Sequence, residues 1–500
     1  MIESMSTTKP DVIEIVADDL GCWAIAYAGN PEIYTPNIDR LASEGIYFVN
    51  FFSVSPAGSA ARASLLTGRI PSYHGVHDNV CDGNLSVEDG GDEYGQSRSV
   101  QFLDGLMGYP DVLAESGYTC GRCGQWNLGD ALTPQMSHDL WYVQAVGDSP
   151  YYKTPMVVDG KVCHETAYVN DAITIKALEF IRENSDNPYY LSINFPTPHG
   201  AWDCHKHPDQ LLQRYDECTF DMCPADFTHP WLVDTITCSN ETERRRMLAH
   251  YYAGVTAVDE GVGRILAYLE SQGKRENTLI FFTSGNGINL GHHGVWGGGN
   301  GTNPLNMYDT SLKVPTIISM PNTVPVGRID RTMLSHYDWR PTLMSLLGIE
   351  DPELYELPGE DFKEILFGGD VTNRNEIIVL AEYGPARMIR DRHWKYIQRF
   401  GDGPDELFYL TMDPGEMINL VDKAYQRARL ETLKYDMDRF FEDYSMPGNR
   451  GVDYPIGGGG QYRPLSEAGH GRALFGGSGH WVDGNGNPRG DGYIPPDKFI

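Results

Sequence analysis

The sequence predicts an α/β fold built on a large mixed, mainly parallel sheet that is flanked by helices. Three observations lead to this prediction. Short apolar runs at 11–17, 189–195 and 278–283 have the length and composition of buried parallel strands. The segments 168–184 and 246–271 carry apolar residues at helical spacing. Strands that alternate with helices along a chain are typical of sheets covered by helices.

Each predicted helix carries one apolar stripe. In the first, apolar residues recur at Ala172, Ile175, Leu178 and Ile181. In the second, one face collects Leu248, Tyr252, Val255, Val258, Val262, Ile265 and Leu269. Such a stripe buries one side of a helix against a sheet. Asp18, Asp19 and Asn286 directly follow strand candidates, and the carboxyl ends of strands are where open α/β sheets bind ligands.

The C-terminal part of the chain predicts a second, smaller unit. Short runs favour antiparallel strands at 377–382, 386–389 and 394–399, and 424–444 has the pattern of an amphipathic helix. The residues after this helix are rich in Gly and Pro, with four consecutive glycines at 457–460. Two interpretations of this tail stay open: it is flexible, or it wraps around a neighbouring subunit of a homo-oligomer.

Composition narrows the class of protein. The 500 residues are 41% hydrophobic, which is enough for a core, and the formal net charge is −30. This charge argues against nucleic acid and anionic membranes as partners. No apolar run approaches the roughly 20 residues of a membrane helix, and the first ten residues contain no hydrophobic signal region. Nine cysteines, an odd number, favour a reducing cytoplasmic location over a disulfide framework.

Six short motifs occur in a fixed order. They are the strand ending in Asp18-Asp19, GSAARASLLTGR at 58–69, GQWNLGD at 124–130, Pro198-His199, TSGNG at 283–287 and WGGGNG at 296–301. Together they resemble the motifs of type I sulfatases, within the alkaline phosphatase superfamily. The resemblance covers most of the chain. It implies a sulfatase-like catalytic-type domain over 1–370, a C-terminal antiparallel α+β subdomain over 371–445, and an extended tail over 446–500.

Five positions depart from the family's pattern. Gly58 stands where the family has the Cys or Ser that is oxidised to formylglycine. The other four departures replace a Lys by Gln125, a His by Asn127, a metal-binding Asp by Gly285 and a Lys by Gly298. Glycine has no side chain to oxidise, so any activity must be independent of formylglycine. Charge-assisted hydrogen bonds are about twice as strong as neutral ones, so losing three cationic donors weakens sulfate binding.

The retained positions supply the candidate site. The resemblance implies catalytic roles for Asp18, Asp19, His199 and Arg62. We expect substrate contacts at Gly58, Gln125, Asn127, His292, His293 and Gly298. The family binds one Ca²⁺, and here its ligands would be Asp18, Asp19 and Asn286. Ca²⁺ prefers six to eight oxygen ligands. Gly58 and Gly285 each lack the side-chain oxygen that the family has at that position, so we expect this protein to bind Ca²⁺ weakly. Without a cation, the adjacent carboxylates raise the pKa of one of them, as a general acid requires.

Two functional hypotheses follow. The first is a hydrolase that cleaves a sulfate ester or a glycosidic bond of a carbohydrate without formylglycine. The second is an inert pseudoenzyme that binds a glycan or regulates a partner. The carbohydrate substrate is implied by the resemblance alone. Most of the substituted positions are those that bind or react with sulfate in the family, whereas the surrounding motifs are still recognisable. This pattern favours the hydrolase.

Overall fold

The central element is a mixed sheet that runs through the middle of the molecule. The computed structural model describes residues 9–200, 207–225, 227–233, 240–370, 379–401, 403–467 and 473–476. Within them the sheet has eleven strands, in the order β12-β2-β11-β8-β1-β7-β3-β4-β5-β6, with β13 paired to β2. They are β1 (Asp11–Asp18), β2 (Ile46–Phe52), β3 (Thr119–Gly124), β4 (Leu140–Gln144), β5 (Thr154–Val158), β6 (Lys161–Glu165), β7 (Tyr189–Pro198), β8 (Thr278–Ser284), β11 (Lys313–Ser319), β12 (Arg328–Asp330) and β13 (Leu334–Ser335).

The centre of the sheet is parallel and part of its periphery is antiparallel. Strands β8, β1, β7, β3 and β4 pair in parallel. Strand β11 pairs antiparallel with both β8 and β2, and β5 and β6 add antiparallel edge strands. This arrangement confirms the predicted mixed, mainly parallel sheet. The three strands predicted at 11–17, 189–195 and 278–283 are the central β1, β7 and β8.

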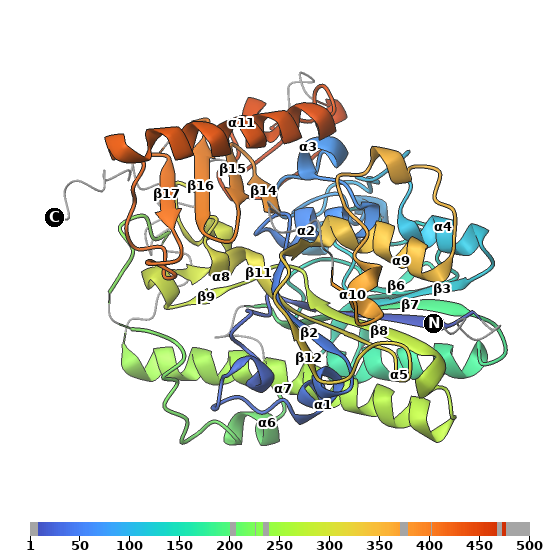
Figure 1. Ribbon diagram of the computed structural model, residues 1–500. Coiled ribbons are helices and arrows are strands. Elements are labelled where there is room, and N and C mark those ends of the chain that lie inside the picture. Colours follow the sequence, from blue (N-terminus) through green and yellow to red (C-terminus); the bar gives the residue numbers. More distant parts are fainter. Residues whose placement is uncertain are drawn as a thin grey trace.

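Helices cover both faces of the sheet (Figure 1). One layer contains α1 (Pro36–Ser43), α5 (Val169–Glu183), α6 (Asp209–Gln213) and α7 (Glu241–Ser271). The other contains α2 (Gly58–Thr67), α3 (Pro71–His74), α4 (Tyr109–Glu115), α9 (Trp339–Leu347) and α10 (Lys363–Leu366), while α8 (Asp309–Leu312) leads into β11. Side chains alternate between the faces of a strand. Ile13 and Ile15 of β1 therefore join the core beneath α5 and α7, and Val12 and Val16 join the opposite core.

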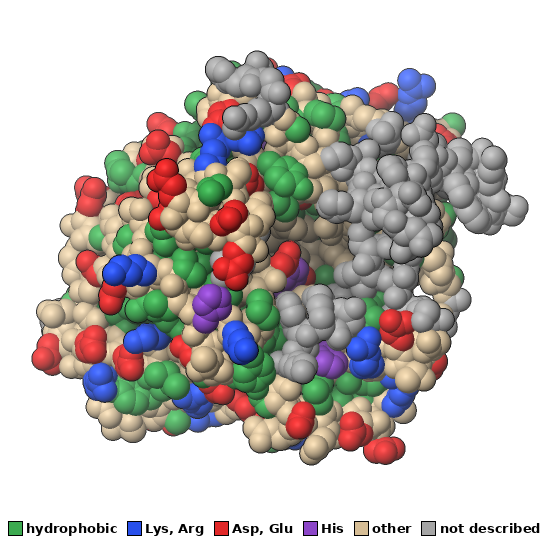
Figure 2. Space-filling model, turned by 180° about the vertical axis from the view of Figure 1, so that it is seen from behind, with side chains coloured by type: hydrophobic (Ala, Val, Ile, Leu, Met, Phe, Trp, Pro, Cys, Tyr) green, Lys and Arg blue, Asp and Glu red, His purple; other side chains and the backbone are tan. Residues whose placement is uncertain are grey.

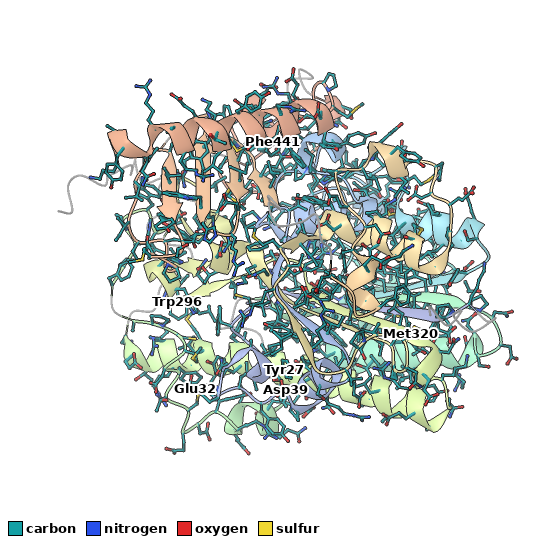
Figure 3. The ribbon with its side chains drawn as sticks, viewed as in Figure 1. Tyr27, Glu32, Asp39, Trp296, Met320 and Phe441 are labelled. Carbon is teal, nitrogen blue, oxygen red and sulfur yellow. The ribbon has the colours of Figure 1, made fainter. Side chains whose placement is uncertain are left out.

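A four-stranded antiparallel sheet forms the smaller C-terminal unit. Its strands are β14 (Val379–Tyr383), β15 (Ala386–Arg390), β16 (Trp394–Arg399) and β17 (Glu406–Tyr409), and α11 (Arg427–Tyr444) lies across them (Figure 1). Phe441 points from α11 toward the sheet (Figure 3) and shares a core with Leu380 and Ile389. The predicted strand 377–382 begins outside the described residues. The predicted domain boundaries stay predictions.

The described part of the tail packs against its own chain. The backbone N–H of Gly460 donates to Asp78 Oδ2 at 3.0 Å, and Gln461 N–H donates to the Asn79 carbonyl at 2.7 Å. The Cys81 N–H returns a bond to the Gln461 carbonyl at 2.9 Å. This part of the tail therefore supports the loop that follows α3. A homo-oligomer formed through the tail stays a prediction.

Acidic side chains are scattered over the face in Figure 2 rather than gathered in one patch. The same face has a hollow near its centre, bordered by acidic and histidine side chains. Among the described helices, none combines the length and the apolar character needed to cross a bilayer.

A buried ion pair holds the C-terminal end of α2. The fully buried Arg340 of α9 donates to both carboxylate oxygens of Asp351, at 2.7 and 2.9 Å. Its remaining nitrogen donates to the carbonyls of Thr67, the last residue of α2, at 2.7 Å and of Met107 at 2.9 Å. Because α2 begins at Gly58, this ion pair also supports the candidate site.

We expect Arg340→Met to lower the free energy of unfolding by about 3–5 kcal/mol, because it leaves the buried Asp351 carboxylate unpaired. The double variant Arg340→Met/Asp351→Leu should recover part of this loss, since the buried Asp351 charge is removed with its partner and Glu353 keeps its contact with Arg69. Urea unfolding of both variants measures the difference. A single variant as stable as the native protein would contradict this role.

Candidate functional site

The parallel strands β1, β7 and β8 place polar side chains at one edge of the sheet. Asp18 ends β1 and Asp19 follows it, while His199 follows the end of β7. In the strand register, Asp18 stands beside Pro198, and Ala17 stands beside Ser284 at the end of β8. Asn286 comes two residues after Ser284. The Asn286 amide donates to Asp19 Oδ1 at 2.6 Å, so the residues that follow these strands meet directly.

These side chains line a cavity of about 590 Å³. The cavity also receives the N-terminal residues of α2, the loop after α3, the segment after β3, and the loop between β4 and β5. Its volume lies within the range of small-molecule sites. The structure brings nine of the residues singled out in the sequence to this cavity: Asp18, Asp19, Gly58, Arg62, Gln125, Asn127, His199, Asn286 and Gly298.

His199 bridges two carboxylates. Its Nδ1 lies 2.7 Å from Asp19 Oδ2, and its Nε2 lies 2.7 Å from Asp148 Oδ1. A carboxylate accepts hydrogen bonds, so both ring nitrogens carry protons and the ring is an imidazolium. Burial alone would lower the pKa of His199, but Asp19 and Asp148 outweigh it and raise that pKa well above 6.5.

Sequence reasoning did not identify Asp148. This residue lies in the loop between β4 and β5, its side chain is 85% exposed, and no motif marks it. Its backbone adopts a left-handed conformation, with φ of 49°, as do Asp19 at 60° and Asn127 at 47°. Asp and Asn tolerate this region better than other non-glycine residues, and such strained positions are frequent at functional sites.

Asp18 is buried next to Arg62. Desolvation raises the pKa of Asp18, although His199 and Arg62 both oppose this effect. Arg62 Nη2 lies 3.5 Å from Asp18 Oδ1 and also donates to Gln125 Oε1, and Nη1 donates to the Trp126 carbonyl at 3.1 Å. Arg62 therefore connects α2, the segment after β3 and the end of β1. Asp18 Oδ1 has no hydrogen-bond partner among the described residues.

Gly58 is the first residue of α2 and opens onto three oxygen atoms. A Cβ at this position would lie 3.3 Å from Asp18 Oδ1, 3.5 Å from Asn286 Oδ1 and 3.6 Å from Asn79 Oδ1. The backbone of Gly58 lies outside the positive-φ region, so its conformation does not require glycine. The fold can therefore accept a small side chain here after a slight shift of Asp18, so the backbone does not require glycine at this position.

Neighbouring hydroxyl and thiol groups do not replace the missing nucleophile. The Ser59 hydroxyl donates to the Asn127 carbonyl at 3.0 Å and accepts from the Val80 N–H at 3.0 Å and the Asn127 amide at 3.3 Å. It is therefore fully engaged. Desolvation, with nearby aspartates, raises the pKa of the Cys81 thiol to about 12. Cys81 stays protonated near neutral pH and is a poor nucleophile.

The segment after β3 enters the cavity because of a glycine. Gly124 has φ of 100°, and a Cβ there would lie 1.9 Å from the Asn194 carbonyl, so only glycine fits. Gln125 and Asn127 then follow into the cavity. Gly298 lies on another side, where an added Cβ would be 3.8 Å from the Asn286 amide nitrogen. Gln125, Asn127 and Gly298 therefore all lie at the cavity, and none of them carries a charge.

The structure does not place His292 or His293 at the cavity. The His292 ring packs on Trp23 with 4.6 Å between ring centroids, and His293 stacks on Tyr308 at 4.0 Å. Burial lowers the pKa of His292 to about 4 and that of His293 to about 3, so both rings are neutral. Aromatic packing directs them away from the expected substrate contact.

The residues do not fit a complete Ca²⁺ shell, which the resemblance implied. In favour of a cation, the buried oxygens Asp18 Oδ1 and Asn286 Oδ1 have no hydrogen-bond partner within the described part of the chain. Against it, both oxygens of Asp19 already accept, from Asn286 and from His199, and positions 58 and 285 offer no side chain. Among the described residues, no three His, Cys, Asp or Glu side chains are grouped as metal ligands. Ca²⁺ usually takes at least six oxygens.

We expect elemental analysis after dialysis against a chelator to find little Ca²⁺ in the native protein, and Gly285→Asp to create a Ca²⁺-dependent site. A Cβ at 285 would lie 3.4 Å from Asp18 Oδ1, so the new carboxylate faces the same space. In EDTA, repulsion between the new carboxylate and Asp18 should lower the melting temperature of the variant, and added Ca²⁺ should restore that temperature. Gly415→Asp, at an exposed turn, is the control. A stoichiometric, chelator-resistant ion in the native protein would contradict this expectation.

Comparisons with known proteins agree with the layers and motifs. The family described as Sulfatase matches residues 10–349, and the family described as N-sulphoglucosamine sulphohydrolase, C-terminal, matches 304–443. The chain is 25% identical over 515 residues to an N-acetylglucosamine-6-O-sulfatase of Bacteroides thetaiotaomicron, covering 86% of each protein. It is 27% identical over 456 residues to an ulvan-active sulfatase of Formosa agariphila, covering 86% of this chain and 80% of the relative.

Solved structures share the fold. A protein in complex with its substrate D-glucosamine-2-N,6-O-disulfate superposes with a TM-score of 0.75 at 23% identity, covering 87% of this chain and 98% of the other. This likeness confirms the predicted architecture of a large mixed sheet with a small C-terminal antiparallel sheet. Because the Sulfatase family matches well over half of the sequence, the chain belongs to the sulfatase family of hydrolases.

Proposed function

We propose that this protein hydrolyses a bond of a glycan without formylglycine, using Asp18, Asp19 and His199. One observation carries the proposal. Acid–base side chains converge beside Gly58, where family members carry the nucleophile, within a cavity of about 590 Å³. The site has therefore lost the covalent chemistry of the family but retains groups that can move protons.

Direct hydrolysis needs two proton transfers. One group protonates the leaving oxygen as its bond breaks, and another takes a proton from the water whose oxygen forms the new bond. His199 can supply the first proton from Nε2, whose present partner, Asp148, lies on an exposed loop. Asp18 Oδ1 can accept the second, because no described residue forms a hydrogen bond with it and it faces the space beside Gly58. Asp19 holds the His199 ring in place.

The carbohydrate substrate is inferred from relatives. The named relatives are an N-acetylglucosamine-6-O-sulfatase and an ulvan-active sulfatase, and the solved complex contains a disulfated glucosamine. These names support a sugar as the ligand class. The cytoplasmic location, and the absence of nucleic-acid or membrane partners, stay predictions from composition.

A glycan-binding pseudoenzyme is the second candidate function. In its favour, the charged groups already form hydrogen bonds within the protein. Both ring nitrogens of His199 and both oxygens of Asp19 have partners. Such a cluster can stabilise a binding site without turning over a ligand. The pseudoenzyme hypothesis predicts binding that survives the loss of an acid–base group, and no product.

The test is a screen of the purified protein against sulfated and unsulfated oligosaccharides, with products detected by mass spectrometry. We expect Asp19→Asn and His199→Gln each to reduce turnover by about 10²–10⁴-fold, because His199 supplies a proton and Asp19 holds its ring in place. Thermal melts should change little. Asp422→Asn and His393→Ala, both at exposed positions, are matched controls. Activity that neither site variant reduces would disprove the site, and absence of any product would favour the pseudoenzyme.

We expect no turnover of a nitrophenyl sulfate, and no rescue by Gly58→Cys alone. The cysteine fits sterically, because its Cβ would meet no atom closer than 3.3 Å. However, the cations that hold sulfate in the family are also absent, at Gln125, Asn127 and Gly298. A colorimetric assay of the native and variant proteins measures this outcome. Ready rescue by the single change would show that these other losses matter little.

A further inference from the structure

The cations of the cavity are already paired with carboxylates. Among the described residues that line it, the charged side chains are Asp18, Asp19, Asp148, Arg62 and His199. Arg62 lies 3.5 Å from Asp18, and His199 lies 2.7 Å from both other carboxylates. The three acids outnumber the two bases, so the lining has no surplus positive charge to offer an anion.

The space beside Gly58 is surrounded by hydrogen-bond acceptors. Asp18 Oδ1, Asn286 Oδ1 and Asn79 Oδ1 lie 3.3, 3.5 and 3.6 Å from the position that a Cβ of residue 58 would take. The first two are buried and have no hydrogen-bond partner among the residues that the structure describes, although Arg62 Nη2 lies 3.5 Å from Asp18 Oδ1. A buried acceptor without a partner is costly, so this space favours a group that donates. An ionised sulfate carries only acceptors, whereas a hydroxyl group donates.

Amide side chains surround the rest of the cavity. They come from several loops and are Asn79, Asn84, Gln96, Gln125, Asn127, Asn286 and Asn300. A primary amide both donates and accepts, which matches the dual character of a sugar hydroxyl. Gln125 and Asn127 replace a Lys and a His of the family motif. The lining has therefore exchanged cations for groups suited to hydroxyls.

Trp296 gives the cavity an apolar wall. It belongs to β10 (Trp296–Gly297), which pairs with β9 (Asn289–Leu290), and its ring is half-buried (Figure 3). An indole face is apolar and has a polar edge, so it can cover the C–H face of a sugar ring while amides bind the hydroxyls.

We propose that this cavity recognises an uncharged, polyhydroxylated pyranose ring, with hydroxyl groups donating to Asp18 Oδ1 and to Asn286 Oδ1 beside Gly58, rather than a sulfate ester. The choice of a sugar rests on the proposed function. The exclusion of sulfate rests on the acceptors and charges of the cavity. The glycan can carry sulfate elsewhere, outside this cavity.

Binding is measured by calorimetry and saturation-transfer NMR in EDTA. The probes are the methyl glycosides of glucose, galactose, mannose, N-acetylglucosamine and N-acetylgalactosamine, the 6-sulfates of the last two, and inorganic sulfate. We expect at least one uncharged glycoside to bind about tenfold or more tightly than any sulfated probe, a difference of about 1.4 kcal/mol. Inorganic sulfate should not compete.

Three variants sharpen the test. Trp296→Ala should weaken binding of the uncharged ring about tenfold by removing the apolar wall, whereas Tyr355→Ala, which removes a fully exposed ring, should not. Gly58→Ser should also weaken it, because the new hydroxyl fills the same space and donates to one of the same oxygens. Gly298→Lys should reduce the difference in affinity between uncharged and sulfated probes, because the lysine adds a cation near Asn286.

Several results would overturn the inference: tighter binding of a sulfated probe, competition by inorganic sulfate, no binding of any uncharged glycoside at tens of millimolar, or sugar binding that appears only with Ca²⁺. The outcome is separable from the proposed function. Uncharged rings that bind while the oligosaccharide screen yields no product would disprove the hydrolase alone. Release of sulfate from a ring bound in this cavity would disprove this inference alone.

Discussion

The parallel pairing of β8, β1 and β7 is the constraint on which the site depends. Parallel strands end at the same edge of a sheet, and their register decides which residues meet there. Here Ala17 stands beside Ser284 and Asp18 beside Pro198, so the residues that follow each strand emerge together. Apolar side chains on both faces of β1 hold this register, because a slip by one residue would exchange them between the two cores and disrupt the packing of both.

The second determinant is the balance of charge within a closed space. The carboxylates that remain at the strand ends are balanced inside the protein by Arg62 and the His199 imidazolium. Charged groups that are paired with each other attract a charged ligand only weakly. Neutral amide side chains cover much of the remaining cavity wall. The cavity of this chain therefore presents a polar surface without surplus positive charge.

Helix α2 connects the rest of the fold to the candidate site. Arg340 holds its C-terminal carbonyl, and Arg62 connects its middle to Asp18 and to the segment after β3. The N-terminal residue, Gly58, is thereby fixed in position although it has no side chain. A well-held helix end without a functional group agrees with a site that has changed its chemistry while keeping its architecture.

Much of the fold and part of the site could be predicted from the sequence. Apolar runs and helical spacing are local properties, so they identified β1, β7, β8, α5 and α7, and ordered motifs identified the family. The stripe predicted for α5 was wrong at Ile175, which is 44% exposed, because Ile173, Ala177 and Phe180 face the core. The partner of His199 at Asp148, the acceptors around Gly58 and the packing of His292 and His293 depend on which loops meet in space. Only the tertiary structure decided these contacts, because hydrogen bonds between distant loops follow from register and packing, which no local pattern encodes.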